Sequence, residues 1–246
     1  MLRVQTIRPA VQFSVTLVIC VLALSCGDNG AGPAGGEDRG WVLRASLPTA
    51  GHLNDIHAVD ANTAIAVGDS GTILRTSDGG ATWMPSTSGT EAYLRSVFFL
   101  DGDTGWAVGY GGVILKTADA GGTWAPRTSG ITAHFGDVFF VDSATGWASA
   151  VDGTVLKTVN GGDLWTQVAT GTAASLTEIF FADAQTGWAV GSDGVVLKSA
   201  NGGSTWSVQT SGTTEMLWGV YFVNSRIGYA VGENGTILKT TTGGER

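Results

Sequence analysis

The side chains most able to do chemistry in this sequence are three carboxylates that fall at one position of an internal repeat, Asp55, Asp137 and Glu178. Two carboxyl groups that face each other can hydrolyse a glycosidic bond, one as the acid and the other as base or nucleophile. Recurrence at a single repeat position instead favours a solvated rim. We therefore predict that the protein is not an enzyme and that none of its residues is catalytic.

Metal and nucleic-acid chemistry have even less support. The three histidines, His52, His57 and His134, share no local spacing of the kind that zinc sites show, so we predict neither a metal nor a cofactor. The formal net charge is −8, and an acidic protein is repelled by phosphate backbones. Nucleic acid is therefore not an expected partner.

An internal repeat of 41 residues positions all of these side chains. It is marked by two aromatic series, Trp83, Trp124, Trp165 and Trp206, and then Trp106, Trp147, Trp188 and Tyr229. Periods of this size indicate one supersecondary unit per repeat, stacked or closed on its neighbours. Residues 41–246 therefore form a domain of five units.

Each unit holds four short runs of β-branched and aromatic residues, separated by turn residues. In the second unit the expected strands are Leu94 to Leu100, Gly105 to Val108, Val113 to Thr117 and Thr123 to Thr128. No window has apolar residues at helical spacing, so the unit is an antiparallel meander. Four strands in about forty residues is the size of a propeller blade. We predict an all-β fold, a five-bladed β-propeller.

The repeat begins and stops out of phase. The last unit breaks off after its third strand, in the run from Thr240 to Arg246, whereas Trp41 to Ser46 form a strand with no unit before it. Pairing these two loose ends would complete the last blade and remove an open sheet edge. We therefore predict that the N-terminal strand closes the propeller.

The turn after the third strand carries the most specific motif. Thr76 to Trp83 and Thr117 to Trp124 fit Ser/Thr-x-Asp-x-Gly-x-Thr-Trp, which resembles the Asp box of BNR repeats in the sialidase superfamily of propellers. The key positions are Asp78, Asp119, Asn160 and Asn201, and the fifth unit has Thr242 instead. A short polar side chain can bond turn amides, so we predict a structural role. A sialidase-type site needs three arginines on one face, and only Arg95 lies in the relevant loops.

The fuller pattern, T-G-W-A-V-G followed by G-V-I-L-K-T and the Asp box, resembles the propeller family named for photosystem II stability and assembly factors. The resemblance covers Trp41 to Arg246 and implies the fold and a broad assembly or binding role. The best-known members have seven blades and a positively charged patch, whereas this chain has five repeats and is acidic. The resemblance therefore implies no photosynthetic function here.

The third strands share a basic residue in every unit, namely Arg75, Lys116, Lys157, Lys198 and Lys239. Such strict symmetry favours a structural role over a binding site. We expect the aliphatic stems to lie on the sheet with their charged heads in water.

Positions that differ between units are where a site could evolve, and the loops that lead into each first strand diverge most. By propeller topology these loops share a face with those between second and third strands. The candidate binding residues are His52, Asn54, Tyr93, Arg95, Tyr110, His134 and Trp218. Aromatic and arginine side chains around one mouth are typical of a binding surface. Drift of loop tips would give the same divergence, and both interpretations stand.

The first forty residues read as a secretion and tethering region. Arg3 and Arg8 precede an apolar run from Val15 to Leu24 that is too short to span a membrane as a helix. The following L-A-L-S-C resembles a bacterial lipobox, which predicts a signal peptide over 1–25 and a lipid on Cys26. Residues 26–40 are Gly-rich and polar, so they read as a tether. An ordinary signal peptide cut nearby is the alternative.

These features predict a non-catalytic lipoprotein of the cell envelope, anchored in the outer membrane, whose propeller binds a protein or another envelope component. The units contain no insertions, and enzymes built on repeats usually need long loops to enclose a site. The alternative from another class is a glycan-binding lectin that uses Tyr93, Tyr110 and Trp218. A glycosidase ranks third.

Overall fold

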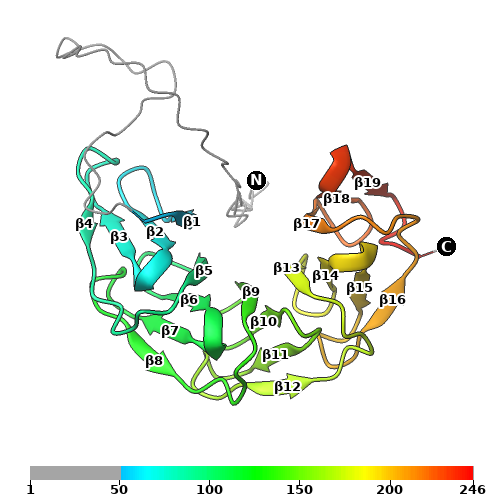
Figure 1. The fold of residues 1–246 in the computed structure, drawn as a ribbon, viewed down its shortest axis with the longest axis horizontal. Coiled ribbons are helices and arrows are strands. Elements are labelled where there is room, and N and C mark those ends of the chain that lie inside the picture. Colours follow the sequence, from blue (N-terminus) through cyan, green and yellow to red (C-terminus); the bar gives the residue numbers. More distant parts are fainter. Residues whose placement is uncertain (1–50, 246) are drawn as a thin grey trace, which may run out of the picture.

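The computed structural model describes residues 51–245, which form five antiparallel sheets joined by tight turns. The sheets stand side by side in an arc, with the first strand of each sheet on its concave side (Figure 1). The fold is therefore all-β and propeller-like, as predicted. Each sheet takes one repeat, and strands follow one another across the sheet in chain order.

We number the sheets 1 to 5 along the chain. Sheet 1 contains β1 (Leu53–Ala58), β2 (Ala64–Gly68), β3 (Ile73–Thr76) and β4 (Met84–Pro85). Sheet 2 contains β5 (Leu94–Phe99), β6 (Gly105–Gly109), β7 (Ile114–Thr117) and β8 (Ala125–Arg127). Sheet 3 contains β9 (Phe135–Phe140), β10 (Gly146–Ala150), β11 (Val155–Thr158) and β12 (Thr166–Val168).

Sheet 4 contains β13 (Leu176–Phe181), β14 (Gly187–Gly191), β15 (Val196–Ser199) and β16 (Ser207–Gln209). Sheet 5 has three strands among the described residues, β17 (Leu217–Phe222), β18 (Gly228–Gly232) and β19 (Ile237–Thr240). Single turns of 3-10 helix follow the second strand in four sheets, at Asp69–Gly71, Tyr110–Gly112, Ser192–Gly194 and Glu233–Gly235. The strands predicted for the second unit agree with the structure to within two residues at each end.

Neighbouring sheets are joined by a buried tryptophan that stacks on a phenylalanine of the next sheet. The pairs are Trp106–Phe140, Trp147–Phe181 and Trp188–Phe222, with ring centroids 3.4–3.5 Å apart and nearly parallel planes. Each indole N–H also donates to a carbonyl in the next sheet's Asp-box turn, at Gly161, Gly202 and Gly243. Stacking and a satisfied indole together make these seams the core of the fold.

A glycine beside each of these phenylalanines leaves room for the stack. In sheet 3, a Cβ on Gly146 would lie 2.5 Å from the ring of Phe140, closer than packed atoms allow. The absence of a side chain lets the ring lie flat over the strand and present its other face to Trp106. The glycine that opens the second strand in sheets 2 to 5 is therefore a packing requirement, whereas β2 in sheet 1 opens with Ala64.

The basic series reinforces the same seams, which agrees with its predicted structural role. Lys116, Lys157, Lys198 and Lys239 place their ammonium groups 5.6–5.9 Å from the ring of Trp106, Trp147, Trp188 and Tyr229, respectively. In sheet 1, Arg75 Nε donates instead to the carbonyl of Ala120 in sheet 2, at 2.8 Å. Each of these lysines lies over a ring of its own sheet, and contacts to the next sheet are made by Arg75, by Lys116 with Asp163 (3.7 Å) and by Lys198 with Glu245 (2.6 Å).

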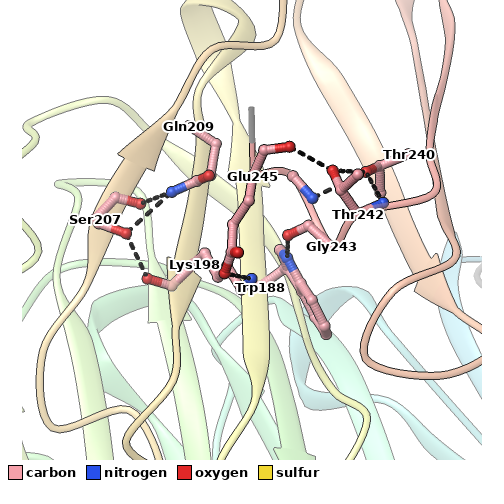
Figure 2. A network of polar contacts seen from close by, with 9 residues as sticks. Trp188, Lys198, Ser207, Gln209, Thr240, Thr242, Gly243 and Glu245 are labelled. Atoms are coloured by element: carbon pink, nitrogen blue, oxygen red, sulfur yellow. Dashed lines mark hydrogen bonds and ion pairs between the residues drawn. The ribbon is translucent and has the colours of Figure 1, made fainter.

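The C-terminal turn docks on sheet 4 through this arrangement (Figure 2). Trp188 Nε1 donates to the Gly243 carbonyl at 3.0 Å, and Lys198 Nζ pairs with Glu245 Oε1 at 2.6 Å. Thr242, which replaces the Asp-box carboxylate, donates its hydroxyl to the Glu245 carbonyl. The turn keeps its place although the motif is lost.

The two ends of the arc do not pair with each other through any strand of residues 51–245, and sheets 1 and 5 stand apart (Figure 1). On sheet 5, Tyr229, Val231 and Ile237 are 41%, 48% and 73% exposed, whereas their equivalents in sheets 2 and 3 are buried. The strand predicted to close the ring, Trp41 to Ser46, lies outside the described residues, as do the signal peptide, Cys26 and the tether. Closure stays a prediction.

Candidate functional site

The loops before each first strand share one face with the loops after each second strand, as the repeat predicted. A backbone hydrogen bond joins the two loops in every sheet. Examples are Tyr110 N to the Tyr93 carbonyl (2.9 Å) and Glu233 N to the Met216 carbonyl (2.8 Å). The Asp-box turns lie on the other face, where Ala120 N donates to the Asp103 carbonyl at 2.9 Å. Divergent loops and structural turns are therefore on opposite faces.

Three of the candidate binding residues form one continuous ring stack over sheets 2 and 3. The ring centroids of Tyr93 and Tyr110 are 4.6 Å apart, and those of Tyr110 and His134 are 4.1 Å apart with an angle of 2° between the planes. The Gly111 N–H donates to His134 Nδ1 at 3.0 Å, so this nitrogen carries no proton. Tyr110 is 41% exposed. The stack forms a rigid aromatic ridge.

Sheet 1 supports this ridge through polar contacts. Tyr93 Oη donates to Asn54 Oδ1 at 2.7 Å, and Asn54 Nδ2 donates to the Leu94 carbonyl at 2.9 Å. Asp69 accepts from the backbone N–H of His52 at 3.3 Å. Burial raises the pKa of Tyr93, although the nearby charge of Arg95 acts to lower it. The sequence did not single out Asp69, because its neighbours come from a different strand.

The structure therefore brings together six of the seven candidates, which we call the aromatic surface: His52, Asn54, Tyr93, Arg95, Tyr110 and His134. Trp218 lies apart from them on β17 in sheet 5. It is 37% exposed and lines a cavity on the concave side of the arc.

The repeated carboxylates are structural bridges, so the predicted solvated rim is wrong. Each one accepts a hydrogen bond from a backbone N–H of the next sheet, 42 residues further along the chain. The pairs are Asp55 with Val97 (2.8 Å), Asp137 with Ile179 (3.1 Å) and Glu178 with Val220 (2.5 Å). Because the innermost strands lie side by side, a carboxylate on one points across the seam instead of into water.

Burial is the main cause of the raised pKa of each of these three carboxyl groups. It raises the pKa of Asp55 to about 7, that of Asp137 to about 6 and that of Glu178 to about 8. Hydrogen bonds from the next sheet lower each pKa without offsetting burial. Ser96 Oγ also donates to Asp137 Oδ1 at 2.6 Å, and Arg95 acts to lower the pKa of Asp137.

A row of aromatic rings runs beside the carboxylates along the concave side. His57, Phe98, Phe139, Phe180 and Tyr221, one from each sheet, follow one another with centroids 5.1–5.4 Å apart. His57 is almost fully buried, and burial lowers its pKa to about 4. Part of this row, with Asp137, Glu178 and Trp218, lines a cavity of about 240 Å³.

The Asp-box side chains perform the structural role predicted for them. Asp78 Oδ2 accepts from Thr82 Oγ1 (2.6 Å), and Asp78 Oδ1 accepts from Thr82 N (2.9 Å) and Thr76 Oγ1 (2.8 Å); these bonds lower the pKa of Asp78 to about 2. Equivalent bonds are made by Asp119, Asn160 and Asn201. Asparagine serves as well as aspartate because the turn needs only an oxygen acceptor.

Residues 51–245 also bear on metal binding and on membrane insertion. In this part of the chain no three His, Cys, Asp or Glu side chains are grouped so that they could hold a metal ion. None of its helices has the length and apolar character to cross a bilayer.

A family model agrees with the geometry. The model for the photosynthesis system II assembly factor YCF48 matches residues 37–130 and 128–208. The chain belongs to this family. The matched residues include the whole aromatic surface and end before sheet 5, so Trp218 and Tyr229 lie beyond them.

Solved structures show the same fold. YCF48 from Cyanidioschyzon merolae matches with a TM-score of 0.63 and 22% identity over 81% of this chain and 71% of that chain. The WD40 β-propeller domain of Doa1 matches with a TM-score of 0.65 and 15% identity, over 80% and 67%. The GH74 enzyme of Niastella koreensis matches with a TM-score of 0.61 and 17% identity, over 79% of this chain and 38% of that chain. No curated protein sequence matches this YCF48-family chain.

Proposed function

We propose that this YCF48-family chain is a non-catalytic scaffold that binds a protein partner through its aromatic surface. The observation that carries the proposal is the ridge of Tyr93, Tyr110 and His134, which is exposed, prearranged and absent from the other sheets. Rigid aromatic groups lose little entropy on binding and are enriched at interaction hot spots. The family's assembly factor supports a protein partner.

Site-specific crosslinking tests this surface. A photo-reactive residue at position 110, on the aromatic ridge, should form an adduct with the partner in the native envelope. The same group at Asp103, on the Asp-box face, should not. Adducts from position 103 alone would place the interface on the Asp-box face and contradict the proposal.

Substitutions on the aromatic surface should weaken the complex. Tyr110→Ala and Arg95→Ala are each expected to lower the affinity for the crosslinked partner by about 1–4 kcal/mol, the range of a hot-spot residue. Asp119→Ala is the control, because it removes turn hydrogen bonds on the opposite face; it should lower the melting temperature without a specific loss of affinity. Affinity would be measured by titration calorimetry with the purified partner.

We also propose that the scaffold is a lipoprotein of the outer membrane, held by a lipid on Cys26 after removal of residues 1–25. The support is the L-A-L-S-C sequence that follows a short apolar run. Cys26→Ser should leave an uncleaved or soluble protein that no longer floats with membranes, as judged by flotation and intact mass. Unchanged mass and membrane partitioning would contradict a lipid at this position.

Residues 41–46, in this proposal, complete sheet 5 and close a five-bladed ring. The support is that sheet 5 has three strands among residues 51–245, whereas the other sheets have four, and that sheet 5 presents an exposed apolar face.

A glycan-binding function is the second candidate. It is favoured by the partly exposed Trp218 beside the carboxylate cavity, since sugars stack on aromatic rings. The stacked rings of Tyr93 and Tyr110 favour it less, because their faces already cover each other. Binding on a glycan array that Trp218→Ala abolishes would replace the protein partner by a sugar, and release of products would indicate a glycosidase.

A further inference from the structure

The cavity on the concave side lies against the innermost strands of sheets 2 to 5, between the carboxylate series and the aromatic row. Its walls include Asp137, Glu178, Phe139, Phe180, Trp218 and Tyr229. Trp218, on the innermost strand of sheet 5, is partly exposed, so a ligand can reach the cavity past it. Its volume of about 240 Å³ is below the range of about 300–1,000 Å³ for drug-sized ligands. The cavity therefore suits the end group of a chain.

The two carboxylates in this cavity differ in what surrounds them. Asp137 accepts a hydrogen bond on each oxygen, from Ser96 and Ile179, and the charge of Arg95 acts on it. Glu178 accepts one bond on Oε2 from the Val220 N–H, and within residues 51–245 its Oε1 accepts none. Glu178 lines the cavity and keeps part of its surface accessible. It is the carboxylate with a free oxygen.

The electrostatics of the cavity favour a positive charge. Burial and the neighbouring charges of Asp137 and Asp55 raise the pKa of Glu178 to about 8, and no positive group of the described chain acts to lower it. The other charged or titratable groups around it are Arg95 beside Asp137, Lys239 over the Tyr229 ring, and the phenols of Tyr221 and Tyr229. A desolvated carboxylate without a counter-ion gains most from a cation that enters beside it.

The remaining walls would attract the same charge. Trp218, Tyr229 and Phe180 border the cavity, and the faces of aromatic rings attract cations. Tyr229 already has the Lys239 ammonium 5.6 Å from its ring centroid. Carboxylate and aromatic walls together also accept the alkyl stem of an organic cation, which a metal ion lacks.

We propose that this cavity binds the guanidinium or ammonium head of an alkyl chain, as carried by an arginine or lysine side chain, with Glu178 as its counter-ion. The alkyl stem lies between Trp218 and the aromatic row. This site is separate from the aromatic surface, and a small cation binds it whether or not a protein partner exists.

Titration calorimetry of the full chain with n-butylguanidinium chloride tests the site, with neutral n-butyramide as the matched ligand. Below about pH 8 the cation must displace a proton from Glu178, so its affinity should fall by about tenfold per pH unit. Between pH 8.5 and 6.5 we expect at least a tenfold loss of affinity, with proton release detected by using two buffers. Equal binding of both ligands, or an affinity independent of pH, would overturn the proposal.

Two substitutions locate the cation. Glu178→Gln keeps an oxygen for the Val220 N–H and removes the charge, so affinity at pH 8.5 should fall at least tenfold. Asp119→Asn is the control, because it removes one carboxylate charge on the opposite face and the equivalent Asp-box positions already hold Asn160 and Asn201; its affinity should stay within about twofold. Unchanged binding by Glu178→Gln contradicts the site. If Glu178→Gln fails to fold, Trp218→Ala and the pH series on the native chain decide it, and no binding at millimolar concentration refutes it.

Discussion

Replacing Trp147 with alanine is expected to lower the free energy of unfolding by about 3–5 kcal/mol, the usual cost of emptying a buried aromatic site. The indole is fully buried, stacks on Phe181 with centroids 3.5 Å apart, and donates Nε1–H to the Gly202 carbonyl at 3.1 Å. Its removal leaves a cavity, strips Phe181 of its stacking partner and leaves a buried carbonyl without its donor. Urea unfolding followed by tryptophan fluorescence and circular dichroism measures the loss.

Tyr229→Ala is the matched control, since Tyr229 has the same repeat position at the end of the arc. It is 41% exposed and has no stacked ring among the described residues, so in an open arc its loss would cost below about 1 kcal/mol. The proposed ring closure would bury it against sheet 1, and we then expect a cost close to that of Trp147→Ala; a cost below about 1 kcal/mol would contradict closure. Equal costs at the two positions would mean that a seam buries Tyr229 as it buries Trp147. That result would contradict an exposed end face and support ring closure against sheet 1.

The sequence predicted the sheets well because their signals are local. Strand runs such as Leu94–Phe99 alternate with turns rich in Gly and Asp, and the 41-residue period repeats this pattern of strands and turns in each of the five units. The seams could not be predicted in the same way. The pairing of Trp106 with Phe140 joins side chains of different sheets, and no local pattern records how two sheets pack face to face.

The three carboxylates show why the sequence alone predicts the wrong surroundings for the concave side. Recurrence at one repeat position fits a solvated rim, but equivalent positions on adjacent innermost strands also face each other across a seam. Asp55 thus reaches the Val97 N–H and is only 9% exposed. The cavity could not be predicted from the sequence for the same reason, because its walls combine Asp137 and Glu178 with Trp218 from a third sheet. Symmetry between repeats is evidence of a shared environment, whether that environment is water or protein.

The aromatic surface was easier to find, because it breaks the symmetry. Tyr93 and His134 share a repeat position that holds His52, Ser175 and Met216 in the other units, and Tyr110 occupies one that holds Asp, Val, Ser and Glu elsewhere. The structure stacks all three rings. What could not be predicted was that their ring faces cover one another. This detail supports the proposed protein partner, because a stacked ridge offers ring edges to a protein more readily than it offers a free ring face to a sugar.

Deleting residues 41–46 is expected to be as damaging as losing a seam. In sheets 1 to 4 the third strand pairs with a fourth, whereas β19 has β18 as its only partner among the described strands. The register of β7 and β8 sets Ile114 opposite Arg127 and Lys116 opposite Ala125. Transferred to sheet 5, this register places Arg44 opposite Ile237 and Val42 opposite Lys239. Without that partner β19 is an open edge that can pair with another molecule.

We therefore expect the deletion variant to aggregate and to melt at a lower temperature, with faster hydrogen exchange in the β19 peptide. Trp41→Ala alone should cost about 3–5 kcal/mol if its indole is buried like those of Trp124 and Trp165. Deletion of residues 30–35 is the control, because it shortens the chain equally within the polar tether. A variant lacking 41–46 that stays monomeric, with unchanged melting and unchanged β19 exchange, would show that another segment protects this edge. If the protection of β19 from hydrogen exchange depends on Trp41, the result supports closure of the ring by residues 41–46.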